Sequence, residues 1–290
     1  MYDIRGVAEP KTVEEALEVL DKNSDLTIIS GGTDVLVKLH EGRMENLDLV
    51  SIREIKELEA ISMLENGDIE IGSRASFTDI FRSEIINKHL GVLAEAAVSM
   101  GGPQIRNIAT IGGNVCNGAV SGDSAPTLFA LNTKLKLKSK NRERIVPISE
   151  FYAGPGIVNI DSNELLLSLI IEKKDYENAK GNYIKFATRK AMDISIMGVS
   201  VVVKVKGNKF NDVRIALGVA GPTPIRCSEA EKLAENLEVN EGNMKLIAHK
   251  ALEASKAIDF WNASKAYKDH LIDELVYRAL KESVKRLGGK

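Results

Sequence analysis

The chain has 290 residues, of which 44% are hydrophobic and 28% charged, with a formal net charge of −2. These values are typical of a globular protein with a sizeable core and room for two domains. A nearly neutral chain lacks the basic field that nucleic acid or anionic lipid attracts, so neither is an expected partner. The opening "MYDIRGVAEPKTVEEALEVL" has no apolar signal core, and no stretch reaches membrane-spanning length, so we expect no membrane contact.

The residue types that bind metals are sparse and scattered. There are two cysteines, Cys116 and Cys227, and four isolated histidines. Two cysteines are too few for a disulfide framework, which makes a reducing cytoplasm the expected location. We expect neither a zinc site nor an iron–sulfur cluster held by this chain alone. No nucleophile or acid–base pair stands out, so no catalytic side chain is predicted.

The N-terminal segment predicts a βαβ-like start. Residues 12–23, "TVEEALEVLDKN", are typical of a helix with Thr12 as its N-cap. Residues 26–30, "LTIIS", predict a short buried strand. The Gly31-Gly32 pair then predicts a turn into a further helix, "DVLVKLHEG".

The middle of the chain mixes strands, helices and a glycine-rich stretch. "DLVSI" and "DIEIGS" predict strands, and residues 76–100 predict a helix in two pieces. Residues 101–135 predict a long ordered loop that ends at a helix near Asp123, and loops of this length are usually functional. After it, "KLKLKSKNRERIVPI" predicts a hairpin and "ELLLSLII" a strand.

The composition of the sequence changes near residue 175. The polar stretch "KKDYENAKGN" predicts a linker or a domain-crossing loop, which divides the chain into residues 1–175 and 176–290. Beyond it, "NYIKFATRKA" and "SIMGVSVVVKVKGNKFNDVRIALGVAG" predict three strands, and the tail predicts helices. Strands followed by helices favour an α+β domain whose helices cover one face of an antiparallel sheet.

Residues 27–37, "TIISGGTDVLV", combine a strand, a Gly-Gly turn and a helix start. Unsatisfied backbone N–H groups there can hold an anion, and glycine lets an oxygen approach closely. The Asp34 carboxylate is unsuited to phosphate, so we expect it to cap the helix together with Thr33. A tight turn without any ligand is the alternative interpretation. The spacing does not match G-x-G-x-x-G, which disfavours a Rossmann site.

Residues 109–118, "ATIGGNVCNG", repeat the device of a threonine near two glycines, with Asn114 offering an amide. Two such loops in one domain suit a long ligand with a central diphosphate. Asp123 can accept hydrogen bonds from ribose hydroxyls or an adenine amine, and it is also expected to be the N-cap of "SAPTLFAL". Cys116 is either a redox thiol or a small buried side chain, and the second interpretation is favoured.

Five motifs together resemble a known family. "SGGTDVLVKL", "GGPQIRNIATIGGNVCNGAVSGDSAP", "FYAGPG", "RKAMDIS" and "GVAGPTPIRCSEAE" occur in the order seen in FAD-binding subunits of bacterial xanthine dehydrogenases. These subunits belong to the molybdenum hydroxylases, as do those of carbon monoxide and nicotinate dehydrogenases. The resemblance covers essentially the whole chain. The phrases "GGPQIRN" and "NGAVSGDSAP" favour the xanthine dehydrogenase branch.

The resemblance implies a fold and a cofactor site. The implied fold is α+β: a two-part, PCMH-type FAD-binding domain (1–175), then a smaller α+β domain (176–290) like the C-terminal domain of the carbon monoxide dehydrogenase flavoprotein, with a three-stranded antiparallel sheet. The implied FAD ligands are Thr27, Ile28, Ile29, Ser30, Gly31, Gly32, Thr33 and Asp34 at the diphosphate, Ala109, Thr110, Ile111, Gly112, Gly113 and Asn114 in the second loop, Asp123 on the ribose–adenine side, Met100, Ile111 and Leu165 near the rings, and Lys185 beside the isoalloxazine. The alternative interpretation of Lys185 is a solvated strand lysine.

The resemblance also implies a place in an electron-transfer chain. A large partner subunit would carry the molybdenum cofactor, and a small one would carry 2Fe-2S clusters. The FAD of this chain would take electrons from the clusters and pass them to NAD⁺ or a similar acceptor, such as NADP⁺ or ferredoxin. The alternatives are the FAD subunit of a nicotinate dehydrogenase or another hydroxylase, and a nucleotide-binding scaffold without redox turnover.

Overall fold

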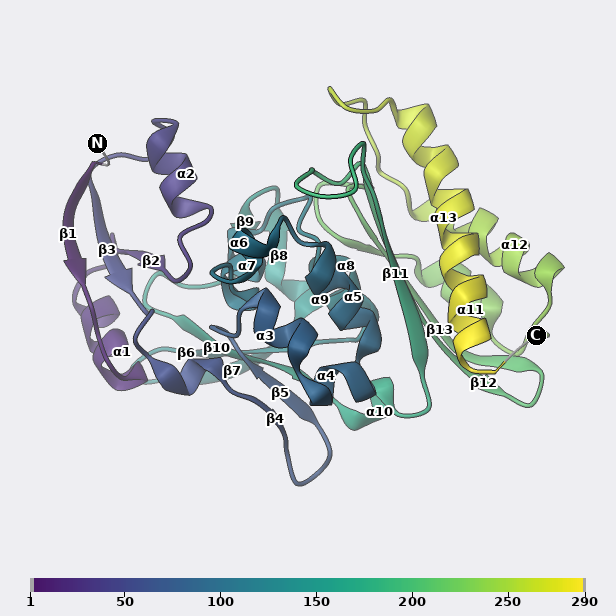
Figure 1. Cartoon of the computed structure of the whole chain (residues 1–290), viewed down its shortest axis with the longest axis horizontal. Coiled ribbons are helices and arrows are strands. Elements are labelled where there is room, and N and C mark those ends of the chain that lie inside the picture. The colour runs from purple at the N-terminus through teal and green to yellow at the C-terminus, as the bar shows by residue number, and fades with distance from the viewer. Residues whose placement is uncertain (1–2, 289–290) are drawn as a thin grey trace.

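A computed structural model describes residues 3–288 of the chain (Figure 1). A small parallel sheet lies at the N-terminal end, a larger antiparallel sheet with helices lies in the middle, and a second antiparallel sheet with its own helices lies at the C-terminal end. The predicted α+β fold, with a two-part N-terminal region and a smaller C-terminal α+β region, is confirmed.

The predicted βαβ-like start is present as a three-stranded parallel sheet in the order β1-β3-β2. Thr12 caps the first helix, as expected, by accepting a hydrogen bond from the Glu15 N–H at 3.1 Å. The first strand and the short second helix complete this part. The elements are β1 (Ile4–Ala8), α1 (Val13–Lys22), β2 (Thr27–Ile29), α2 (Val35–His40) and β3 (Leu47–Ser51).

The middle part is a five-stranded antiparallel sheet in the order β4-β5-β10-β6-β7, packed against a group of short helices. Strand β10 lies at the centre of this sheet, between β5 and β6, although it follows both of them and the glycine-rich stretch in the chain. The elements are η1 (Lys56–Glu59), β4 (Ile61–Met63), β5 (Ile69–Gly72), α3 (Phe77–Arg82), α4 (Glu84–His89), α5 (Gly91–Ser99), α6 (Pro103–Arg106), α7 (Ile111–Asn117), α8 (Ala125–Ala130), β6 (Lys134–Lys138), β7 (Glu143–Pro147), α9 (Ile148–Phe151), β8 (Tyr152–Gly154), β9 (Ile157–Val158), β10 (Leu165–Ile171) and α10 (Lys173–Tyr176).

The glycine-rich stretch is not the continuous loop that the sequence predicts, because it contains the short helices α6 and α7. Glycine disfavours a helix by about 1 kcal/mol relative to alanine. Here the surroundings compensate. Thr110 caps α7 by accepting a hydrogen bond from the Gly113 N–H at 3.3 Å, and the Gly112 N–H donates to the Ser73 carbonyl at 2.9 Å.

The C-terminal sheet has four strands rather than the predicted three, in the order β11-β12-β13-β14. The additional strand β14 is only two residues long, too short to leave a periodic pattern in the sequence. The predicted helical tail is present. The elements are β11 (Lys180–Phe186), β12 (Met197–Lys206), β13 (Lys209–Gly218), β14 (Ile225–Arg226), α11 (Ser228–Ala234), α12 (Glu241–Ala251), η2 (Leu252–Ala254) and α13 (Lys265–Arg286).

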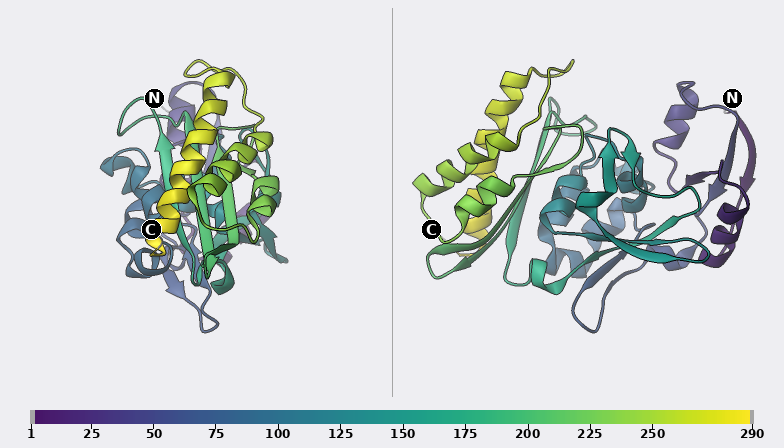
Figure 2. Two further views of the ribbon diagram at one scale, coloured as in Figure 1. Left: turned by 90° about the vertical axis from the view of Figure 1, so that its right-hand side faces the viewer. Right: turned by 180° about the vertical axis from the view of Figure 1, so that it is seen from behind.

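Both faces of the C-terminal sheet are covered. Alternate residues of β12 point to opposite sides, as the pleat of a strand requires. Val199, Val201 and Val203 pack in the core formed with α11, α12 and α13, whereas Val202 packs in the core of the middle part. Figure 2 shows the helical tail on one side of the sheet and the middle part on the other. The C-terminal helices therefore cover one face, as predicted, and helices of the middle part cover the other face.

The polar stretch predicted to be a linker or a domain-crossing loop is packed against both neighbouring parts of the structure. It contains α10, and Asp175 within that helix is buried. The Asp175 carboxylate accepts hydrogen bonds from Asn132 at 2.7 Å and from buried Arg214 of β13 at 3.3 Å. The polar composition of this stretch reflects buried ion pairing as well as exposure. A domain boundary between residues 175 and 176 stays a prediction.

One buried ion pair fixes the turn before β10. The Glu164 carboxylate accepts hydrogen bonds from Arg144 Nε at 2.7 Å and Nη2 at 2.6 Å, and from the Asp161 N–H at 3.0 Å. The Arg144 guanidinium, followed by the Asp161 N–H, holds the pKa of Glu164 below its ordinary value of 4.5 against the effect of burial. The stabilisation is therefore present above 4.5 and is lost as the pH falls through the pKa of the folded state.

We predict that Glu164→Gln lowers the free energy of unfolding by about 2 kcal/mol at neutral pH, because it removes a buried charge-assisted pair. Urea unfolding of both proteins at neutral pH and in acid measures the difference. The difference should shrink in acid, where the wild-type carboxyl also becomes neutral. Glu177→Gln, which alters an exposed pair with Lys173, is the matched control and should change little. An equal loss at both pH values would contradict the role given to this charge.

Candidate functional site

A cavity of about 840 Å³ lies between the small parallel sheet, the glycine-rich stretch and the end of β11. Its size is near the upper end of the range of roughly 300–1,000 Å³ for small-molecule sites. All but two of the eighteen residues implied as FAD ligands line it. Those lining it are Thr27, Ile28, Ser30, Gly31, Gly32, Thr33, Asp34, Met100, Ala109, Thr110, Gly112, Gly113, Asn114, Asp123, Leu165 and Lys185.

Two implied ligands do not line the cavity. Ile111 is fully buried in the core of the middle part, so the structure does not support its expected place against a ring of the cofactor, which stays a prediction. Ile29 belongs to β2, and its Cδ1 atom lies beneath the Gly32 turn, 3.3 Å from where a Cβ on that glycine would be. Both are apolar residues next to a loop, and their sequence positions do not reveal which side of the backbone faces the ligand.

The two glycine loops touch each other through their backbones. A Cβ atom on Gly31 would lie 1.8 Å from the Ile108 carbonyl oxygen, a distance that no side chain can adopt. A Cβ on Gly112 would lie 2.6 Å from the Ser73 carbonyl oxygen. The sequence predicts glycines that make room for a ligand oxygen. At these two positions the glycines instead make room for a neighbouring segment of the protein itself.

The first loop offers free hydrogen-bond donors. Within residues 3–288, the N–H groups of Gly31, Gly32 and Thr33 have no protein acceptor, and all three residues line the cavity. Gly32 has a φ of +73°, which favours glycine and points successive peptide groups in the same direction. Consecutive N–H groups of this kind form a concave site for an anion.

The second loop differs, because its donors are already used. The N–H groups of Ile111, Gly112 and Asn114 donate to backbone carbonyls, and the Gly113 N–H donates to the Thr110 hydroxyl. The second loop therefore does not offer these four N–H groups to a ligand. Its contribution to the cavity is shape and side chains, including the Asn114 amide, whose Oδ1 accepts from Ser124 at 2.7 Å.

A chain of side chains bridges the two loops. Lys38 Nζ of α2 donates to Asn117 Oδ1 at 2.7 Å, and Asn117 Nδ2 donates to Asp34 Oδ1 at 2.9 Å. Asp34 occupies the N-cap position of α2 but makes no capping hydrogen bond, so its expected capping role, shared with Thr33, is wrong. Its carboxylate joins the loops instead. Lys38 and Asn117 were not singled out from the sequence, because both lie within the quoted motifs but several residues beyond the glycine pairs.

Asp123 is a buried carboxylate of the cavity with three hydrogen-bond donors around it. It is only 5% exposed, and it accepts from Lys185 Nζ at 2.7 Å, Ser195 Oγ at 2.7 Å and the Tyr183 hydroxyl at 3.4 Å. All three donors come from the C-terminal part. The N-cap position of α8 belongs to Ser124, so the expected capping role of Asp123 is wrong. Burial raises the pKa of Asp123, while Lys185 and the two hydroxyls oppose that rise.

The pairing of Asp123 with Lys185 constrains what each can do. The resemblance places Asp123 at the ribose–adenine side and Lys185 at the isoalloxazine, the two ends of the cofactor. Side-chain atoms 2.7 Å apart cannot serve opposite ends of an extended FAD, so at most one of these two roles holds. Lys185 is also not a solvated strand lysine, because its side chain is only 13% exposed.

Cys116 lies in α7 and lines the cavity. Burial raises the pKa of its thiol to about 12, and a thiol with so high a pKa carries little reactive thiolate at neutral pH. This agrees with the favoured interpretation of a small packed side chain. Among residues 3–288, no group of three or more His, Cys, Asp or Glu side chains is placed to hold a metal ion.

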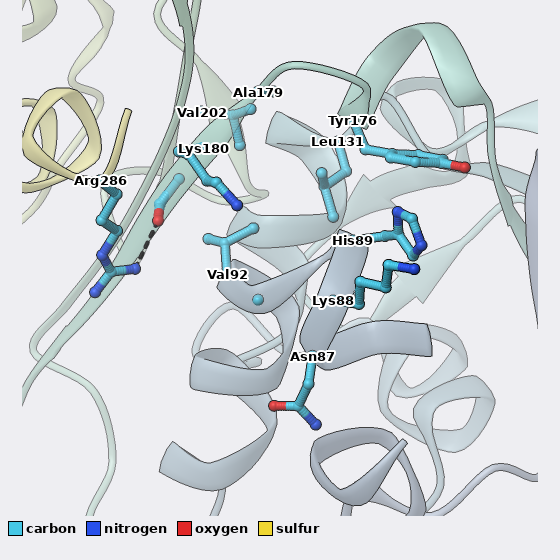
Figure 3. Close-up of a pocket in the computed structure, with 12 residues that line it drawn as sticks. Asn87, Lys88, His89, Val92, Leu131, Tyr176, Ala179, Lys180, Val202 and Arg286 are labelled. Carbon is cyan, nitrogen blue, oxygen red and sulfur yellow. Dashed lines mark hydrogen bonds between the residues drawn. The ribbon is translucent and has the colours of Figure 1, made fainter. Parts of the chain in front are cut away.

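A second, smaller pocket of about 320 Å³ lies away from the glycine loops (Figure 3). It lies where α4 and α5 meet β11 and β12, and His89 and Tyr176 contact each other there with ring centroids 5.5 Å apart. Arg286 Nη1 donates to the Gly181 carbonyl at 2.7 Å on its far side. None of the implied FAD ligands lines this pocket.

In the described part of the chain, no helix is both long and apolar enough to cross a membrane.

Comparisons with known proteins agree with this geometry. Residues 2–173 match the family model "FAD binding domain in molybdopterin dehydrogenase", and residues 182–283 match "CO dehydrogenase flavoprotein C-terminal domain". The chain is 37% identical over 290 residues to the xanthine dehydrogenase FAD-binding subunit of Escherichia coli O157:H7, covering 100% of this chain and 99% of the relative.

Two further comparisons extend the range of relatives. The nicotinate dehydrogenase FAD-subunit of Eubacterium barkeri is 34% identical over 231 residues, or 77% of each chain. The fold is similar to that of a chain in the solved carbon monoxide dehydrogenase of Hydrogenophaga pseudoflava, with a TM-score of 0.93, 25% identity and 99% coverage of both chains.

The cavity residues fit FAD. The donors of Gly31, Gly32 and Thr33 lack protein partners, as a diphosphate site requires. The Ser73 hydroxyl in the cavity wall is buried and likewise has no partner within residues 3–288, so a ligand oxygen or hydroxyl can satisfy it. Lys38 adds a cation beside the first loop.

We predict that Asn117→Ala weakens FAD binding by about 5- to 10-fold, equivalent to about 1–1.4 kcal/mol, because it releases Lys38 and Asp34 from each other. Titration of the flavin-free chain with FAD, followed by flavin fluorescence, measures the dissociation constant. Asn66→Ala, in the exposed turn before β5, is the matched control and should leave it unchanged. Equal effects of the two substitutions would contradict the bridge.

Proposed function

Because the chain belongs to the family of FAD-binding subunits of molybdenum hydroxylases, and is thus an oxidoreductase subunit, we propose that it transfers electrons within a xanthine dehydrogenase-type complex. The electrons would arrive from iron–sulfur clusters of a small partner subunit, which receive them from a large molybdenum subunit. They would leave to NAD⁺ or a similar acceptor. The observation that carries the proposal is one cavity that joins both glycine loops to residues of the C-terminal part.

Each part of the cavity has a defined task in this proposal. The N–H groups of Gly31, Gly32 and Thr33 hold the diphosphate, and Lys38 neutralises part of its charge. The Ser73 hydroxyl takes a hydrogen bond from the sugar side of the cofactor. The pair Asp123–Lys185 lies at the C-terminal end of the cavity, where we place the isoalloxazine. Bound FAD supplies the ability to accept electrons singly and release them as a pair.

The protein's own contribution is position and electrostatics. None of the cavity residues needs to act as nucleophile or general acid for electrons to pass, and the buried carboxylates Glu164 and Asp123 are both held by cations. The chain would work in the cytoplasm, where its two unpaired cysteines stay reduced. The substrate of the whole complex is chosen by the molybdenum subunit, so nicotinate or another heterocycle fits this chain as well as xanthine.

The proposal differs from a non-redox scaffold in one measurable way. An electron carrier binds a flavin that dithionite reduces reversibly, whereas a scaffold needs only a nucleotide. The absorption spectrum of the purified chain loaded with FAD, recorded before and after dithionite, separates the two. We expect stoichiometric flavin that bleaches and recovers on exposure to air. A chain that binds adenine nucleotides but excludes the isoalloxazine would contradict electron transfer.

We predict opposite effects on the flavin midpoint potential when either partner of the Asp123–Lys185 pair is made neutral. Lys185→Met leaves the carboxylate uncompensated and should lower the potential, because negative charge opposes reduction. Asp123→Asn leaves the ammonium uncompensated and should raise it. For about 1–2 kcal/mol of changed interaction, each shift is roughly 20–40 mV for a two-electron couple.

Potentiometric titration of both variants against the wild type measures these shifts. Ser195→Ala removes a hydrogen bond to Asp123 without changing any charge, and it is the matched control. Shifts of the same sign in Asp123→Asn and Lys185→Met, or none in either, would move the isoalloxazine away from this pair.

A further inference from the structure

Three apolar side chains are exposed on the C-terminal side of the cavity mouth. Met192 and Ile194 are each 54% exposed and Trp261 is 74% exposed, yet all three line the cavity. We call these three residues the rim platform. Large apolar side chains that are both exposed and part of a ligand cavity mark a surface that another molecule covers.

The Met192 side of the rim platform is built into the fold. Met192 has a φ of +54°, a conformation that residues other than glycine rarely adopt. Two contacts hold it there: Arg189 Nη2 donates to the Met192 carbonyl at 2.6 Å, and Asp193 Oδ2 accepts from the Arg189 N–H at 2.7 Å. A Cβ on Gly102 would lie 2.6 Å from the Met192 sulfur, so a glycine makes room for this side chain. Strain maintained by such contacts is concentrated at functional sites.

A buried lysine contacts the segment that carries Trp261. Lys268 of α13 is 2% exposed, donates to the Ile258 carbonyl at 3.1 Å and lies 5.6 Å from the centre of the Phe260 ring. The Phe260 ring lies 6.2 Å from that of Trp261. A buried lysine thus fixes the segment that carries the indole. The indole itself is left facing solvent at the mouth.

Cations lie next to the rim platform. The Arg189 side chain is 68% exposed, and its contact with Asp193 is a long one of 3.6 Å. Lys190 follows it in the chain and is exposed. An indole with a free face stacks on a planar aromatic ring, and exposed guanidinium and ammonium groups attract phosphates. The combination suits a molecule that carries both a planar ring and a diphosphate.

We propose that the rim platform binds the planar ring of the electron acceptor, a pyridine dinucleotide, with Arg189 and Lys190 directed to its phosphates. This rests on the proposed function, since it places a second planar ring beside the isoalloxazine end of the cavity. An acidic electron-carrier protein would need a broad basic face. Here the platform consists of three apolar side chains, and the two exposed cations are neighbours in the chain, which favours the small dinucleotide.

Trp261 is the only tryptophan of the chain, so its fluorescence reports on the rim platform alone. The full chain loaded with FAD is titrated with NAD⁺, and with inorganic pyrophosphate as a probe that carries the charge but no planar ring. We expect saturable quenching by NAD⁺ and none by pyrophosphate. Lys190→Met, which leaves the contact of Arg189 with Met192 in place, should raise the half-saturating concentration about 5- to 10-fold, the effect of losing one charged phosphate contact. Arg82→Met, an exposed arginine of α3 outside the cavity, is the matched control.

A second measurement follows the anaerobic bleaching of bound flavin by NADH, in which the hydride passes to the flavin and NAD⁺ is released. Trp261→Ala should raise the half-saturating NADH concentration about 10-fold, while FAD content and reduction by dithionite stay unchanged, and Trp261→Phe should restore most of the loss. Unsaturable quenching, an unchanged half-saturation, or loss of FAD from Trp261→Ala would overturn the inference. The proposed function would survive each of these outcomes and fails only if the wild-type chain holds no reducible flavin.

Discussion

The buried carboxylate of Asp123 is the contact on which the site depends. It belongs to the N-terminal part, and its three donors, Lys185, Ser195 and Tyr183, all belong to the C-terminal part. A carboxylate that is 5% exposed is costly to bury unless a cation and hydrogen bonds compensate it. The pair therefore ties the two parts together at the cavity. Removing either charge leaves the other buried alone, which disrupts the joint more than the loss of a surface pair would.

The two glycine loops look alike in sequence and do different work. The first presents the unpaired donors of Gly31, Gly32 and Thr33, whereas the donors of the second are consumed by its own helix and by Ser73. The loops meet where Gly31 touches the Ile108 carbonyl, and the Lys38–Asn117–Asp34 chain holds them together a few residues further on. The second loop thus supports the first. A diphosphate bound here would meet free donors on the first loop, and the second loop would supply the shape of the opposite wall.

Much of this could be predicted from sequence, and the failures have physical causes. The capped helix after Thr12, the hairpin and the late antiparallel sheet follow from periodicity and turn residues. The helix α7 could not, because the tertiary contact of Gly112 with Ser73, together with the Thr110 cap, overrides the poor helix propensity of glycine. Asp34 and Asp123 were expected to be helix caps on local grounds. Instead, each bonds to a partner more than sixty residues away in the chain. Trp261 had no signal at all, since only the fold brings it to the cavity.

A crystal structure of the chain with FAD tests the central claim most directly. The claim is that the diphosphate lies on the first loop and the isoalloxazine at the Asp123–Lys185 end. The result expected is diphosphate oxygens within about 2.7–3.2 Å of the N–H groups of Gly31, Gly32 and Thr33, with no rearrangement of the second loop. An adenine ring beside Lys185, or a diphosphate bound to donors of the second loop, would contradict it.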